Sequence, residues 1–197
     1  MTSETVTNVI QSIRGHRERF ERFSRSLSAE ELALPVPEST WSVKDFIIHL
    51  ATLDIELVRW FDGVGAGKLD AGASNTDGSP FNLDDWNEIE VSKRRSQSLD
   101  EIFEEAARNR EKLIDCLGRL EDAQIEQVVH FNGDNKRDPA NVQFKLFLLG
   151  WARHDPIHVA DMVKAMPDRA QDPEVVAWLN DPAVKWYQNA MAGPAKR

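Results

Sequence analysis

Apolar residues recur at helical spacing over four long stretches of this chain, and this pattern constrains the fold more than any other feature. No stretch shows the strict alternation of apolar and polar residues that is typical of a half-buried strand. Four long amphipathic helices pack most simply as a bundle. We therefore predict an all-α four-helix bundle with negligible strand content. Its long helices are expected at 4–27, 43–62, 99–118 and from Asp138-Pro139 to about 166.

Capping residues mark where several helices are expected to begin. Ser42 and Asp45 form a capping box at the start of 43–62, and Ser98 begins a similar box ahead of 99–118. Each cap satisfies backbone N–H groups that the first helical turn cannot pair internally. These local signals support the helix boundaries independently of the apolar pattern.

Shorter helices are expected outside the four long ones. Asn82 can cap an extra short helix in the region 81–96. Asp172-Pro173 and Asp181-Pro182 each place a capping residue before a proline at the first helical position. We therefore predict a C-terminal helical extension over 172–192.

The last long helix has two unusual features. From Phe144 to Trp151 it is apolar nearly all round, which predicts the most buried element of the bundle. Pro156 lies inside it, removes one backbone hydrogen bond and crowds the carbonyl of Ala152. A kink or a broken turn is therefore expected at this point.

The segment 63–80 interrupts the helical pattern. It holds half of the chain's ten glycines and almost no large apolar residue, so we expect a long glycine-rich loop. Loops of this length are binding loops or lids in some proteins and disordered segments in others. Both interpretations remain open here.

Composition limits the classes of partner and compartment. The 24 Lys and Arg residues face 33 Asp and Glu residues, and the net charge of −9 disfavours nucleic acid. The densest basic cluster, Lys93-Arg94-Arg95, is typical of a solvated helix face. A single cysteine and the lack of a long apolar run favour the cytoplasm and disfavour a membrane. A length of 197 residues fits one domain, 1–197.

Two of the five histidines stand four residues apart on the last long helix. At about 100° per residue this spacing returns His154 and His158 to one face, one turn apart, where both can hold one ion. His49 lies on the second long helix and, taken alone, is more typical of a packed core residue than of a metal ligand. An HExxH zinc peptidase is disfavoured, because Asp155 stands where that motif has its glutamate. A di-iron site is disfavoured too, because Trp151 stands where that site needs a carboxylate.

Two sequence strings carry a resemblance to a known family. They are Trp41-Ser42-Val43-Lys44-Asp45-(3)-His49-Leu50 and His154-Asp155-Pro156-Ile157-His158. Their combination resembles the DinB/YfiT-like superfamily of four-helix bundles. In that superfamily a histidine of the second helix and an HxxxH pair of the last helix bind a divalent metal. The resemblance covers a bundle core of about 5–166, without the glycine-rich loop or the chain from 167 onward.

The resemblance implies that His49, His154 and His158 are the metal ligands. Three imidazoles suit Zn²⁺, Ni²⁺ or Fe²⁺ and leave positions for water or substrate. Asp161 shares the face of the pair, where it can accept a ring N–H, add a ligand or simply be an exposed aspartate. Glu56 is a candidate for proton transfer, although a solvated helix position explains it equally well.

The function implied by the resemblance is a metal-dependent thiol S-transferase or isomerase that acts on a small molecule. Relatives include mycothiol-using maleylpyruvate isomerases and bacillithiol-using transferases, so a low-molecular-weight thiol is the expected co-substrate. A hydrolase using metal-activated water and a non-catalytic binding protein remain alternatives. Six tryptophans and the apolar last helix leave surplus apolar surface, from which we predict a homodimer.

Overall fold

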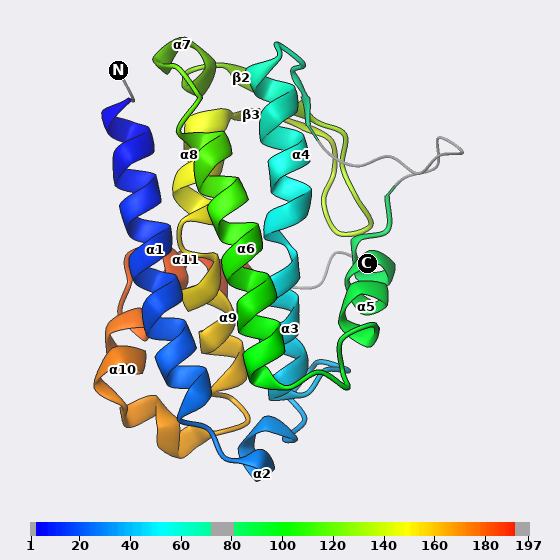
Figure 1. Ribbon diagram of the computed structural model, residues 1–197, viewed down its shortest axis with the longest axis vertical. Helices are drawn as coiled ribbons and strands as arrows, with labels where there is room; N and C mark the ends of the chain where they lie inside the picture. Colours follow the sequence, from blue (N-terminus) through cyan, green and yellow to red (C-terminus); the bar gives the residue numbers. More distant parts are fainter. Residues whose placement is uncertain (1–2, 72–80, 192–197) are drawn as a thin grey trace. The chain divides into compact units, whose positions relative to one another are not determined.

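The computed structural model describes residues 3–71 and 81–191, and most of them are helical (Figure 1). A 3-10 helix, η1, spans Pro167–Gln171, and the strands are β1 (Asp70–Ala71), β2 (Val128–Phe131) and β3 (Ala140–Gln143). The α-helices are α1 (Glu4–Arg25), α2 (Ala29–Leu32), α3 (Val43–Thr52), α4 (Asp54–Gly65), α5 (Leu83–Ser92), α6 (Leu99–Leu117), α7 (Asp122–Ile125), α8 (Phe144–Trp151), α9 (His154–Met162), α10 (Pro173–Leu179) and α11 (Pro182–Met191). The prediction of an all-α fold is confirmed.

The helix starts agree with the capping signals, except that Asp172 at the start of α10 makes no side-chain capping hydrogen bond. The Ser42 hydroxyl accepts a hydrogen bond from the Asp45 amide at 3.2 Å, and the Asp45 carboxylate accepts one from the Ser42 amide at 3.0 Å. Ser98 forms a complete capping box at α6, and Asn82 caps α5 through its side-chain oxygen. The Asp181 carboxylate accepts a hydrogen bond from Ala183 at the start of α11. These caps are local, which explains why the sequence alone reveals them.

The chain divides into two compact units. The first comprises the residues up to Gln11 together with Ile48–Leu149. In it α4 and α6 run side by side, drawn in cyan and green in Figure 1. Between them Arg110 donates to Asp54, which is fully buried, at 2.5 Å. The apolar and aromatic side chains in the core of this unit include Leu57, Phe61, Val64, Ile102, Leu113, Leu117 and Phe144.

The second unit comprises Ser12–Ile47 and the chain from Gly150 onward. Its C-terminal helices α10 and α11 contact α9. Trp178 and Val184 from these two helices are buried, at 1% and 0% exposure. Arg22 of α1 pairs with Glu174 of α10 at 2.7 Å. The predicted helical extension therefore packs onto the rest of its unit.

The expectation of negligible strand content is wrong for one region. β2 and β3 pair as an antiparallel hairpin, and β1 pairs in parallel with β2. Residues 140–143 were expected to be helical from Pro139 onward, but they form β3, and the helix begins at Phe144. Gly133, at φ +84°, provides the left-handed turn conformation that the hairpin connection needs. Cross-strand pairing overrides the local helix-start signal of Asp138-Pro139.

Two predicted long helices are broken. The helix expected over 43–62 ends at Thr52 and resumes at Asp54. The Thr52 hydroxyl donates to the His49 carbonyl at 3.0 Å, and such bonds compete with the helical ladder and bend helices. The last long helix is interrupted between Trp151 and His154, as Pro156 predicts.

Two further expectations need correction. The α8 helix is not the most buried element, because Leu146 is 59% and Leu149 37% exposed. The expected loop 63–80 is shorter at its start, since α4 continues to Gly65, and it contains β1. The rest of that loop, 72–80, lies outside the described residues. In the part of the chain that the structure describes, no helix is long and apolar enough to cross a membrane.

Candidate metal centre

His154 and His158 lie on α9 with the Nε2 edges of their rings together. Their Nε2 atoms are 3.2 Å apart, and the two rings meet edge to face. Two nitrogens bound to one tetrahedral ion at about 2.05 Å are separated by about 3.3 Å. The observed separation therefore matches the geometry needed to hold one ion, and it results from the four-residue spacing on a helix.

Asp161 lies on the opposite edge of the His158 ring. Its Oδ2 is 3.3 Å from His158 Nδ1, and its Oδ1 accepts a hydrogen bond from Lys164 at 2.9 Å. Burial alone would raise the pKa of Asp161, but the hydrogen bonds from His158 and Lys164 outweigh it and lower the pKa. An ionised carboxylate at Nδ1 favours the tautomer with a proton on Nδ1, which directs the Nε2 lone pair toward His154.

Aromatic rings hold both imidazoles in place. The Trp151 ring stacks on His154 with centroids 4.1 Å apart and planes 19° from parallel. Phe46 of α3 lies 5.6 Å from the His158 ring. Such contacts restrict the side-chain rotations on which ligand geometry depends. Sequence reasoning missed Trp151 in this role, although its position three residues before His154 could have indicated it.

A buried ion pair supports the first turn of α9. Asp155 follows His154 directly, and its carboxylate accepts two hydrogen bonds from Arg17 of α1, at 2.9 and 3.0 Å. The side chains of Arg17 and Asp155 are 10% and 3% exposed. Sequence reasoning used Asp155 as the residue that breaks the peptidase motif and as part of the string that resembles the DinB family, and gave it no structural role. Its partner lies 138 residues away, so no local pattern points to this pair.

His49 lies in α3 and is 5% exposed. Its side chain and those of His154 and His158 each offer one ligand nitrogen, and these nitrogens lie within 4.8 Å of one another. Among the described residues, this is the group of histidine, cysteine and acidic side chains whose geometry suits a metal ion. The cluster is compatible with metal binding, and its chemistry does not identify the metal.

The other candidates have simpler structural roles. Glu56 is partly exposed on α4 and pairs with Arg59, and its part in proton transfer stays a prediction. His16 accepts a hydrogen bond from Trp178, and His130 contacts Asn141 across the hairpin. The basic cluster follows the end of α5 and is not part of a helix face. Lys93 and Arg95 are exposed, whereas the Arg94 side chain is 17% exposed and pairs with Glu90 and Glu105.

The single cysteine is buried and poorly suited to be a nucleophile. The Cys116 thiol lies 3.1 Å from Asp62 Oδ1, to which it donates. Burial is the largest cause that raises the pKa of Cys116 to about 12, and Asp62 raises it further. A thiolate is the reactive form of cysteine, and almost none is present at this pKa near neutral pH.

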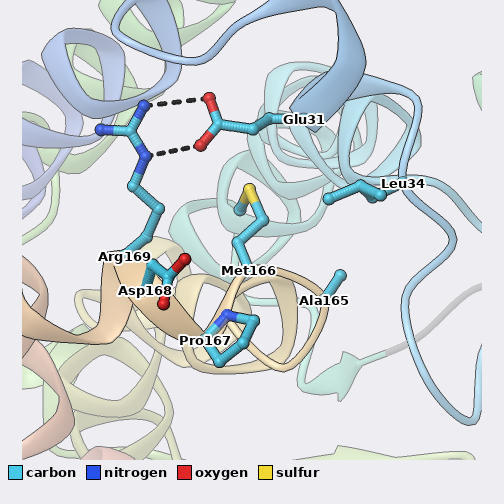
Figure 2. A pocket seen from close by; sticks show the side chains of 7 residues that line it. All are labelled: Glu31, Leu34, Ala165, Met166, Pro167, Asp168 and Arg169. Carbon is cyan, nitrogen blue, oxygen red and sulfur yellow. Dashed lines mark hydrogen bonds and ion pairs between the residues drawn. The ribbon is translucent and has the colours of Figure 1, made fainter.

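A small pocket of about 180 Å³ lies in the second unit, at the end of α9 (Figure 2). Glu31 and Arg169 form one side of it and are joined by two hydrogen bonds of 2.7 and 2.9 Å. Met166 and Pro167 lie on another side. Glu31 and Arg169 neutralise each other, and the carboxylate of Asp168 also lines the pocket.

Comparison with known proteins assigns the family. The sequence profile of the DinB superfamily matches residues 12–162. This chain belongs to the DinB superfamily. The three histidines of the candidate metal centre all lie inside the DinB match, whereas α10 and α11 lie beyond its end. No curated protein matches the sequence.

Solved structures share the DinB fold at low sequence identity. YfiT from Bacillus subtilis, described as a probable metal-dependent hydrolase with an unusual four-helix bundle topology, has a TM-score of 0.60 at 15% identity, over 85% of this chain and 90% of YfiT. The mycothiol-dependent maleylpyruvate isomerase has a TM-score of 0.59 at 14% identity, over 87% of this chain and 65% of the isomerase. A histidine-to-alanine variant of that isomerase has a TM-score of 0.58 at 12% identity, over 80% of this chain and 60% of the other.

These matches confirm the prediction of a four-helix bundle of the DinB type. This chain spans less than two thirds of the isomerase, so a substantial part of that enzyme has no counterpart here. At these identities the likeness establishes the fold alone.

Proposed function

We propose that this protein is a metal-dependent enzyme whose divalent ion is held by His49, His154 and His158. The observation that carries the proposal is the 3.2 Å separation of the His154 and His158 Nε2 atoms. The third nitrogen, from His49, lies within 4.8 Å of both. Three imidazoles suit Zn²⁺, Ni²⁺ or Fe²⁺ and leave coordination positions for a substrate.

A divalent ion in this position would supply Lewis acidity and lower the pKa of a thiol or water that reaches it. Residues of this chain orient the imidazoles that would bind the ion. Asp161 holds the His158 ring through Nδ1, and Trp151 holds the His154 ring by stacking. Glu56 and Asp161 are the candidate groups for accepting a proton from the substrate, and both roles remain part of the proposal.

The leading reaction class is thiol-dependent transfer or isomerisation of a small molecule. The fold of the mycothiol-dependent maleylpyruvate isomerase, shared over 87% of this chain, supports this class. Cys116 is a poor source of a reactive thiolate, because its thiol is buried and its pKa is raised. A thiol reaction would therefore use a low-molecular-weight thiol as co-substrate.

A metal-dependent hydrolase is the second candidate. YfiT supports it, because the match covers 90% of YfiT but only 65% of the isomerase. In a hydrolase, water would take the place of the thiol, and Glu56 or Asp161 would accept its proton. The two candidates share the ligands and differ in the nucleophile.

The test begins with metal content. Purified protein loaded with Zn²⁺ or Ni²⁺ should retain about one ion per chain after dialysis, and His158→Ala should retain far less. His130→Ala is the matched control, because His130 is an exposed histidine on β2 that contacts Asn141. Equal metal retention by wild type and His158→Ala would refute the proposed site.

Turnover then separates the reaction classes. The metal-loaded protein is incubated with an electrophile or an activated ester, with and without mycothiol, bacillithiol or glutathione. Metal-dependent turnover that requires a thiol supports the transferase or isomerase, and thiol-independent turnover supports the hydrolase. Metal retention without turnover on either panel would instead indicate a metal-binding protein.

A further inference from the structure

The buried pair of Arg17 and Asp155 joins α1 to the first turn of α9, the helix that carries the histidine pair. Asp155 sits between His154 and His158 in sequence, and its side chain is 3% exposed. Arg17 Nε donates to one carboxylate oxygen and Nη2 donates to the other, at 2.9 and 3.0 Å. Both residues belong to the second compact unit. Two parallel hydrogen bonds fix the angle and the distance between α1 and the first turn of α9.

This turn of α9 has little internal means of fixing its own position. The helix restarts at His154 after the break that follows Trp151. Arg153 at the N-cap provides no side-chain hydrogen bond to the first turn. Pro156 lacks an N–H, so it cannot contribute a helical hydrogen bond. The orientation of His154 therefore depends on contacts made by α9 with other elements.

Stability alone is a weak reason for a buried ion pair. Removing two charges from water costs about as much as their attraction returns, and apolar replacements of similar size are often neutral or stabilising. What an apolar pair cannot reproduce is the directional geometry of two hydrogen bonds. The useful contribution of Arg17 is therefore geometric.

We propose that Arg17, acting through Asp155, is a positioning residue that sets the rotation of the His154–His158 pair toward its metal ion. This inference rests on the proposed metal-binding function. A rotation of α9 by one residue, about 100°, would carry both imidazoles to another face. A much smaller rotation already disturbs coordination, because metal ligands tolerate deviations of only about 0.2 Å.

The test uses Co²⁺ as the probe, because its visible absorption reports coordination geometry independently of enzyme activity. The decisive variant replaces both partners, Arg17→Met with Asp155→Leu. It leaves no buried charge unpaired, so we expect it to fold with a melting temperature close to wild type. Its Co²⁺ affinity should fall by about tenfold to a hundredfold, with an altered absorption band, as is typical when support for a metal ligand is lost.

The control variant removes the pair of Glu31 and Arg169 in the same way, by Glu31→Leu with Arg169→Met. That pair has the same two-hydrogen-bond geometry at 2.7 and 2.9 Å, but it lies at the far end of α9. Its Co²⁺ affinity and spectrum should match wild type. Arg17→Lys keeps the charge but cannot donate two parallel hydrogen bonds from one planar group, so its Co²⁺ affinity should lie between those of wild type and the double variant.

The outcomes separate the two proposals. If wild type binds no Co²⁺, both the metal centre and the positioning role are refuted. If wild type binds Co²⁺ and the folded double variant binds it equally well with the same spectrum, only the positioning role is refuted. Should the double variant fail to fold, Arg17→Lys decides, and a wild-type affinity and spectrum in that variant would overturn the inference.

Discussion

The thiol of Cys116 should react far more slowly than a free thiol, and the structure gives the size of the effect. A thiol of pKa 8.5 is roughly one quarter ionised at pH 8. With the pKa of Cys116 raised to about 12, the ionised fraction is about one in ten thousand, roughly two thousand times less. The more basic thiolate is intrinsically about fortyfold more nucleophilic, for a Brønsted coefficient near 0.45. The net slowing from ionisation is therefore about fiftyfold.

Burial slows the reaction further, because only 2% of Cys116 is exposed. The assay follows reaction of the native protein with an aromatic disulfide reagent at pH 8, beside glutathione. In denaturing urea the two thiols should react at similar rates. Asp62→Ala should react faster than wild type but slower than glutathione, because burial, the largest cause of the raised pKa, remains. A native rate within tenfold of glutathione would show that the thiol is reactive.

Three other perturbations test separate parts of the structure. Asp161→Asn should weaken Zn²⁺ binding about tenfold or more in a chelator competition, because His158 loses its charged partner at Nδ1. Arg110→Met should lower the free energy of unfolding in urea by about 3–5 kcal/mol, because Asp54 is left buried and uncompensated. Burial and then Arg19 lower the pKa of His16 from 6.5 to about 4 in the folded protein, so on acidification the unfolded state takes up this proton first. The free energy of unfolding should therefore fall as the pH is lowered from 6.5 toward 4, and His16→Gln should make this fall smaller.

Each of these predictions has a clear contrary result. Unchanged Zn²⁺ affinity in Asp161→Asn would remove that carboxylate from the metal centre. A loss below about 1 kcal/mol in Arg110→Met would show that Asp54 reaches water or another partner. An identical pH dependence of wild type and His16→Gln would place the acid sensitivity elsewhere.

Much of the helical structure could be predicted because its causes are local. The α6 helix spans Leu99–Leu117 against an expected 99–118, since its apolar spacing and its Ser98 cap lie within the helix itself. The kink before His154 follows from the chemistry of Pro156 alone. The pairing of His154 with His158 was also predictable, because four residues make about one helical turn.

Other features depend on partners that are distant in sequence. Residues 140–143 carry a valid helix-start signal, yet they pair with β2 and become a strand. The apolar surface of α8 was expected to be fully covered, but Leu146 is 59% exposed. The spacing of apolar residues shows which face of a helix is apolar, but whether other elements cover that face depends on how they pack.

The amino-acid sequence by itself determined most of the helices, their caps and the adjacent histidine pair on α9, because each depends on hydrogen bonds and side-chain contacts within about four residues. Tertiary structure alone decided the hairpin, the fork from Arg17 to Asp155 across 138 residues, and the placement of the His49 nitrogen within 4.8 Å of the other two. Those features arise from burial and charge pairing between distant segments, which no local pattern encodes.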